Sequence, residues 1–310
     1  MLTPSSLACL AHIPTINLTT GCAHECRYCY AQGYLTYPGN GKIRLYTNTL
    51  TKLKEELARK RRKPTVVYFS PSSDPFQPVP EVLDMTYEVF RFLLESNIGV
   101  AFVTKGQIPQ QHHELLAAHT PLIQGRIGLI TLDSSIAAAF EPGAAKPETR
   151  LVQAAGLIGA GIPVEARLDP ILPGVTDGPD CLNRVCDALA RIGVCTIAAS
   201  VLFLRPAVVA SLRRNIQDKS ILQRLLDRFA NAAPLAIHAE NSRVRAISTA
   251  DRVEIMERLR NIAAANGLKV LVCACKNPDI TSGSCHISGR WPPGDNEKTV
   301  NEKSQLLLFQ

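Results

Sequence analysis

The sequence lacks the marks of a membrane or secreted protein. It contains no run of roughly 18 apolar residues, the length that a membrane-spanning helix needs. Residues 1–14 contain no lysine or arginine and no long apolar stretch, so we expect no secretory signal peptide. Ten cysteines in such a chain favour metal ligands or thiols in a reducing compartment over disulfides. We therefore expect a cytoplasmic protein with no membrane partner.

The sequence also lacks a strong excess of one charge. Its 310 residues carry a formal net charge of +7, which permits an anionic partner without requiring one. The densest basic run, residues 59–63, lies at the end of a predicted helix at residues 48–62. Cations in the last turn complement the helix dipole, so we favour a solvated helix end over a nucleic-acid patch. The charge alone thus gives little support to a nucleic-acid partner.

Strand-like and helix-like segments alternate along the first two-thirds of the chain. Strands are expected at residues 16–19, 65–70, 99–104, 125–132, 163–168 and 195–204. Helices are expected at residues 48–62, 80–95, 110–119, 147–160 and 180–192. Consecutive βα units predict an α/β fold with a parallel sheet that is curled into a barrel or partial barrel.

The last third of the chain has a different pattern. We expect helices at residues 211–230 and 251–266, a strand at residues 268–272, and a poorly ordered tail rich in proline, glycine and charge. The predicted division is an N-terminal segment (1–14), a barrel core (15–205), a C-terminal α/β extension (206–290) and a flexible tail (291–310).

Three closely spaced cysteines suggest a metal centre. Cys22, Cys26 and Cys29 have the spacing Cys-x3-Cys-x2-Cys, and Tyr28 precedes the last of them. Thiolates are the ligands of iron–sulfur clusters. A zinc site is the alternative, but zinc usually takes four ligands in paired blocks and no second short block follows nearby. We therefore favour an iron–sulfur cluster.

Polar residues follow the predicted strands, where active sites of parallel α/β barrels gather. The candidates in these loops are Ser72, Ser73 and Asp74 after the second strand, Lys105 after the third, and Asp133 and Ser134 after the fourth. Hydroxyls and a carboxylate on the proline-rich loop of residues 70–78 can hold a polar ligand. A turn with hydroxyl caps is the alternative for that loop, and a solvated turn residue is the alternative for Lys105.

The fifth predicted strand contains two charged residues on one face. Glu165 and Arg167 are two positions apart, so their side chains point to the same side of the strand. Opposite charges inside a barrel are costly unless they are paired or bound to a ligand. We favour active-site residues over a purely structural ion pair.

Four motifs together resemble the radical SAM superfamily, and most closely its branch with spore photoproduct lyase. They are the cysteine loop of residues 21–30, Ser-Ser-Asp-Pro-Phe-Gln-Pro at 72–78, Val-Thr-Lys at 103–105 and Leu-Asp-Pro-Ile-Leu-Pro-Gly at 168–174. The resemblance covers residues 15–205. It implies a radical SAM partial (βα)6 TIM-like barrel with a C-terminal α/β extension.

The resemblance also implies an enzyme with two cofactors. Cys22, Cys26 and Cys29 would hold a 4Fe-4S cluster whose open iron binds S-adenosylmethionine (SAM). Reduction by a donor such as flavodoxin or ferredoxin would split SAM and yield a 5′-deoxyadenosyl radical, which abstracts hydrogen from an unidentified substrate. The implied cofactor contacts are Tyr28, Ser72, Ser73, Asp74, Asp133 and Ser134, and the catalytic candidates are Glu165, Arg167 and Lys105.

The sequence departs from spore photoproduct lyase at one position that matters for mechanism. That enzyme carries a hydrogen-donating cysteine just ahead of its Ser-Asp loop, whereas this chain has Ser70, Pro71 and Ser72 there. A serine O–H bond is too strong to replace a thiol as hydrogen donor, which argues against thymine-dimer repair by the same mechanism. Nucleic-acid lesion repair is kept as an alternative, and so is a non-catalytic iron–sulfur electron carrier or redox sensor.

A second cysteine set lies in the C-terminal third. Cys273, Cys275 and Cys285, with His286 next to the last, are expected to bind a second iron–sulfur cluster. A zinc site and unligated thiols at a strand end are the alternatives.

Overall fold

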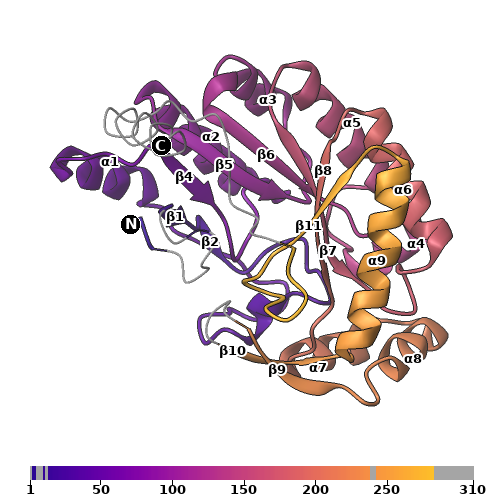
Figure 1. Ribbon diagram of the computed structural model, residues 1–310. Coiled ribbons are helices and arrows are strands. Elements are labelled where there is room, and N and C mark those ends of the chain that lie inside the picture. Colours follow the sequence, from indigo (N-terminus) through magenta and orange to yellow (C-terminus); the bar gives the residue numbers. More distant parts are fainter. Residues whose placement is uncertain (1, 5–9, 11–12, 238–241, 283–310) are drawn as a thin grey trace, which may run out of the picture.

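A computed structural model describes residues 2–4, 10, 13–237 and 242–282 of the chain. Its main element is a parallel sheet with the strand order β1-β4-β5-β6-β7-β8-β11 (Figure 1). The strands are β1 (Thr15–Ile16), β4 (Val66–Phe69), β5 (Gly99–Thr104), β6 (Ile123–Gly128), β7 (Val164–Ile171), β8 (Thr196–Val201) and β11 (Lys269–Val272). All neighbouring pairs are parallel, and no pairing between β1 and β11 closes the sheet within the described ranges. The predicted α/β fold with a parallel sheet is confirmed.

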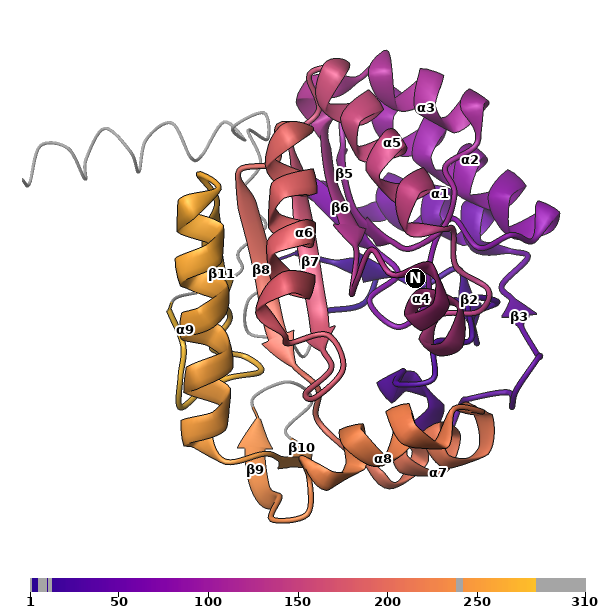
Figure 2. The ribbon, with the colours of Figure 1, turned by 90° about the vertical axis from the view of Figure 1, so that its right-hand side faces the viewer.

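Helices cover the outer face of this sheet. They are α1 (Thr49–Arg59), α2 (Pro80–Glu95), α3 (Gln110–Ala117), α5 (Pro147–Gly159), α6 (Pro179–Arg191) and α9 (Thr249–Ala265). Figure 2 shows α6 and α9 beside β7, β8 and β11, and α2, α3 and α5 beside the other half of the sheet. No helix in the described part of the chain is long and apolar enough to span a membrane.

The helix α2 and the strand β5 have the bounds that the sequence predicts. Pro80 occupies the first helical turn of α2, where its missing N–H is not needed. The buried side chains of α2 recur every three or four positions, so one face packs on the sheet. Within that core, the ring of Phe76 packs edge-to-face against those of Phe90 and Phe102.

Several predicted elements were wrong in their extent. The single helix expected at residues 211–230 is two helices, α7 (Pro206–Asn215) and α8 (Lys219–Asp227). The break occurs because the Asp218 carboxylate caps α8 by accepting hydrogen bonds from two backbone amides of its first turn. The strand expected at residues 16–19 is divided into β1 and β2 (Thr19–Thr20), and β2 pairs with β3 (Arg44–Leu45).

Other elements were not predicted at all. They are the helix α4 (Ser134–Phe140), the 3-10 helices η2 (Tyr30–Gly33) and η3 (Thr120–Leu122), and an antiparallel pair of β9 (Ala233–Ile237) and β10 (Ser242–Ala246). Figure 2 shows α7, α8, β9 and β10 near the end of the sheet where β7 and β8 finish. The predicted tail lies outside the described residues, as does Cys285.

The aromatic packing gives a test of the core. Phe102 on β5 is fully buried between the rings of Phe76 and Phe90. We expect Phe102→Ala to lower the free energy of unfolding by about 3–5 kcal/mol, because it removes buried surface and leaves a cavity. Val152→Ala is the control: Val152 is 73% exposed on α5, and its loss should stay within about 0.5 kcal/mol. Urea unfolding measures both, and equal effects would contradict this account of the core.

Candidate active site

The carboxyl ends of the parallel strands surround one cavity of about 370 Å³. Its walls come from the loops after β1, β4, β5, β7, β8 and β11. Among the predicted site residues, the cavity is lined by Cys22, Cys26, Tyr28, Cys29, Ser72, Ser73, Asp74, Lys105, Arg167 and Cys275. Tertiary structure thus brings together residues that are far apart in the chain.

Gln77 fastens the cysteine loop to the loop after β4. Its side chain is fully buried, and its Oε1 accepts a hydrogen bond of 2.8 Å from the backbone N–H of Ala23. Its Nε2 donates to Thr19 Oγ1 and to the carbonyl of Asp74, both at 2.9 Å. The Phe-Gln-Pro part of the motif at residues 72–78 therefore holds the cysteine loop in place.

Asp74 is a second junction between the same loops. Its Oδ1 accepts from the backbone N–H of Phe76 at 2.9 Å and from Thr104 Oγ1 at 2.7 Å. Its Oδ2 accepts from the Lys105 N–H at 2.8 Å and lies 3.1 Å from His24 Nε2. Burial alone would raise the pKa of the Asp74 carboxyl, but His24 and the amide donors outweigh it and lower the pKa. Its predicted contact with SAM stays a prediction.

Two hydroxyls beside Asp74 have no such partners. The Oγ atoms of Ser70 and Ser73 are buried and have no hydrogen-bond partner among the described residues. Both residues line the cavity. Ser70 has a φ of 55°, a strained conformation for a residue other than glycine. These hydroxyls can therefore bond to a polar molecule in the cavity without breaking an existing contact.

A buried cluster of charged side chains contacts the cysteine loop through Tyr28. The Glu141 carboxylate accepts a hydrogen bond from the Tyr28 hydroxyl and pairs with Arg150 at 2.6 Å. Lys105 Nζ lies 4.0 Å from Glu141 Oε1 and 5.6 Å from the centre of the Tyr28 ring. Burial raises the pKa of the Tyr28 hydroxyl well above its usual range, so Tyr28 is a hydrogen-bond donor here. Sequence reasoning missed Glu141 and Arg150, and it also missed the helix α4 that ends just before Glu141.

Gly143 allows the backbone after α4 to approach the cysteine loop closely. Its N–H donates to the His24 carbonyl at 3.1 Å, and the Arg27 N–H donates to the Phe140 carbonyl at 2.8 Å. A Cβ at Gly143 would lie 2.0 Å from the Ala23 carbonyl oxygen, far inside contact distance. Only glycine fits there, because the two backbones touch.

The three thiols of the cysteine loop are partly exposed to the cavity. Burial raises the pKa of Cys22, Cys26 and Cys29, that of Cys26 to about 12. No group of three or more His, Cys, Asp or Glu side chains is gathered as around a single metal ion in the described residues.

The two charged residues predicted on β7 have separate ion-pair partners. Glu165 pairs with the buried Arg126 at 2.7 Å, whereas Arg167 pairs with Asp169 at 2.6 Å. Lys276 also pairs with Asp169 at 2.6 Å. Burial would raise the pKa of Asp169, but the charges of Lys276 and Arg167 outweigh it and lower the pKa. Arg126, Arg167, Asp169 and Lys276 line the cavity, and sequence reasoning missed three of them.

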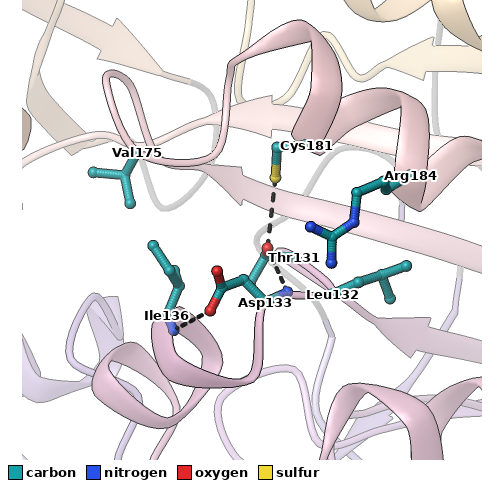
Figure 3. A pocket seen from close by; sticks show the side chains of 7 residues that line it. All are labelled: Thr131, Leu132, Asp133, Ile136, Val175, Cys181 and Arg184. Atoms are coloured by element: carbon teal, nitrogen blue, oxygen red, sulfur yellow. Dashed lines mark hydrogen bonds between the residues drawn. The ribbon is translucent and has the colours of Figure 1, made fainter.

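Asp133 and Ser134 lie elsewhere. Asp133 lines a separate cavity of about 110 Å³ with Thr131, Cys181 and Arg184 (Figure 3). Its carboxylate caps α4 by accepting from the N–H groups of Ser135 and Ile136. Ser134 Oγ donates to Glu148 at 3.2 Å. The contact of these two residues with the cofactor, which the resemblance implies, stays a prediction, and the Asp133 carboxylate already serves as a helix cap.

The second cysteine set forms a close pair at the end of β11. Cys273 and Cys275 are both buried, and their Sγ atoms are 3.1 Å apart. Cys275 faces the cavity. A second cluster on these cysteines and Cys285 stays a prediction.

Comparison with known proteins places the fold. No protein-family model matches the chain. A spore photoproduct lyase variant with bound AdoMet and dinucleoside spore photoproduct aligns with a TM-score of 0.61 and 18% identity, over 83% of this chain and 75% of that chain. A radical SAM Nalpha-GlyT isomerase of Pseudomonas phage M6 is 25% identical over 173 residues, which are 56% of this chain and 35% of that protein. The predicted resemblance to radical SAM enzymes is confirmed. These relatives agree with the prediction of an enzyme.

A further relative shares part of the chain. An uncharacterized protein of Mycobacterium tuberculosis is 26% identical over 200 residues, which are 62% of this chain and 59% of that protein. The chain therefore spans less than two-thirds of the length of these curated relatives.

The buried ion cluster gives a second test. We expect Glu141→Gln to lower the free energy of unfolding by about 3–5 kcal/mol, because the buried Arg150 loses the charge that compensates it. Glu88→Gln is the matched control, since its pair with Arg91 is exposed and should contribute at most about 1 kcal/mol. Urea unfolding of both variants tests this, and a cost for Glu141→Gln no larger than that of the control would refute the structural role.

Proposed function

We propose that this protein is a radical SAM enzyme whose Cys22, Cys26 and Cys29 hold a 4Fe-4S cluster. The observation that carries the proposal is that these three thiols face one cavity at the carboxyl edge of the parallel sheet. When bound, the cluster supplies the electron that splits SAM into methionine and a 5′-deoxyadenosyl radical. A donor such as flavodoxin or ferredoxin would deliver that electron.

The residues present fit such a cluster. Thiolates are its usual ligands, and three of them leave one iron open for SAM. Cys22, Cys26 and Cys29 all line the cavity, so a cluster held by their thiolates would lie within it.

Lys105 contributes charge beside the cysteines. Burial would lower the pKa of its ammonium, but the charges of Cys26 and Glu141 outweigh it and raise the pKa. Lys105 is therefore protonated, and its positive charge lowers the pKa of Cys26 against the larger, opposite effect of burial. This supports a role in the site, as the sequence predicted.

The serines after β4 are the candidates for holding SAM. Ser70 and Ser73 have buried hydroxyls without partners among the described residues, and Ser72 lines the same cavity. The carboxylate of Asp74 is already bonded on both oxygens, so we assign it to positioning the cysteine loop. Glu165 pairs with Arg126 and is proposed to orient that arginine toward the cavity.

The substrate binds in the remainder of the cavity. Arg126, Arg167 and Arg205 line it together with the apolar Phe203 and Val244. Such walls suit a substrate with an anionic group and an apolar part. Damaged nucleic acid is the second candidate, because the structural relative with this fold holds a dinucleoside spore photoproduct and the cavity has several arginines.

The first test measures 5′-deoxyadenosine formation from SAM by anaerobically reconstituted protein with a strong reductant. We expect Cys26→Ala to lower the rate of deoxyadenosine formation at least 100-fold, because a proposed cluster ligand is removed. Cys195→Ala is the control, since Cys195 is exposed and lies outside the cavity wall, and it should keep the native rate. An increase on adding damaged DNA would favour lesion repair.

One outcome of that test would contradict the proposal that the protein is an enzyme. Native protein that holds a full cluster but forms no deoxyadenosine would favour an electron carrier or redox sensor instead.

A further inference from the structure

The two cysteines after β11 are poised for reaction with each other. Their Sγ atoms lie 3.1 Å apart, and the S–S bond of a disulfide is about 2.05 Å long, so closure needs a movement of about 1 Å. Cys275 lines the cavity, whereas Cys273 is not part of its wall. Cys273 and Cys275 pack with Val66 and Ala101, which come from the facing strands β4 and β5.

The turn that carries this pair is firmly held. The N–H groups of Lys276 and Asn277 both donate to the Cys273 carbonyl, at 3.2 and 3.0 Å. Lys276 is tied to Asp169, and Asp279 is clamped by the buried Arg252, with one contact of 2.9 Å. The two sulfur atoms are therefore kept close by a fixed turn rather than by chance rotation of two exposed side chains.

Two adjacent thiols at this distance match a dithiol that can form a disulfide.

We propose that Cys273 and Cys275 are a redox-active dithiol that reacts with small-molecule disulfides entering the cavity. The Cys275 thiolate attacks one sulfur of the disulfide RSSR, whose S–S bond breaks and releases one RSH after protonation. The Cys273 thiolate then attacks the Cys275 sulfur and releases the second RSH. The two protein thiols lose two protons and two electrons, and RSSR is reduced to two RSH.

This reaction goes beyond the proposed function, because it needs neither the cluster nor SAM. It assigns different roles to the two thiols. Cys275 is the attacking thiol because it faces the cavity, and Cys273 is the resolving thiol because it lies behind the wall. A Cys273–Cys275 disulfide would form directly beside Lys276, whose ammonium contacts Asp169.

The test treats the full chain with oxidised glutathione, blocks remaining thiols with an alkylating agent and identifies tryptic peptides by mass. Residues 270–276 lie between two lysine cleavage sites and contain both cysteines and no other. We expect this peptide to be unalkylated and two hydrogen atoms lighter than its reduced form. When dithiothreitol is added before the alkylating agent, both of its cysteines should be alkylated.

Two variants test the roles. Cys273→Ser should accumulate a glutathione adduct on Cys275, because nothing resolves it. Cys275→Ser should form an adduct at least tenfold more slowly, because Cys273 does not line the cavity. Equal rates for the two variants would overturn the assignment of roles.

Three results would overturn the dithiol itself. One is full alkylation of both cysteines after oxidation that does modify the exposed Cys195. Another is a disulfide from either cysteine to Cys285. The third is iron or zinc that the native protein retains and the double variant Cys273→Ser/Cys275→Ser loses, which would assign the pair to a metal site. None of these readouts depends on SAM cleavage, so the proposed function can fail without affecting them.

Discussion

The buried carboxylate of Asp74 is the interaction on which the site depends. A charge inside a protein is tolerated only when its oxygens are bonded and its charge is compensated. Asp74 meets this need with amides and a hydroxyl from the ends of β4 and β5 and with His24 from the cysteine loop. The same contacts fix three loops relative to one another. The hydrogen bonds that the buried Asp74 carboxylate requires therefore also position the loop that contains the three thiols.

The parallel sheet makes this junction possible. Its seven strands run in one direction, so their carboxyl ends meet at a single edge. Among the described residues the sheet stays open, and the Cys273–Cys275 turn, which follows the edge strand β11, packs against β4 and β5. Cys22, Cys26 and Cys29 consequently line the same cavity as Cys275 of the proposed dithiol, although about 250 residues separate them. The two proposals therefore place the one-electron chemistry of a cluster and the two-electron chemistry of a dithiol in a single cavity.

Charge is distributed unevenly around the cavity. Lys105 and the Glu141–Arg150 pair lie beside the cysteine loop. Arg126 and Arg167 belong to β6 and β7, and Lys276 follows β11. Each described acid there has a basic partner, and lysines and arginines outnumber the acids in the wall. An anionic group on a substrate would be attracted to such a wall.

The sequence by itself determined the features that depend on neighbouring residues. The spacing of Cys22, Cys26 and Cys29 indicated the superfamily, and the bounds of α2 and β5 followed from local signals such as Pro80. Only the tertiary structure decided the partners of buried charges. Arg126 and Glu165 are 39 residues apart, Lys276 and Asp169 are 107 apart, and Tyr28 and Glu141 are 113 apart. Such pairs leave no local pattern, because the fold and not the chain brings them into contact.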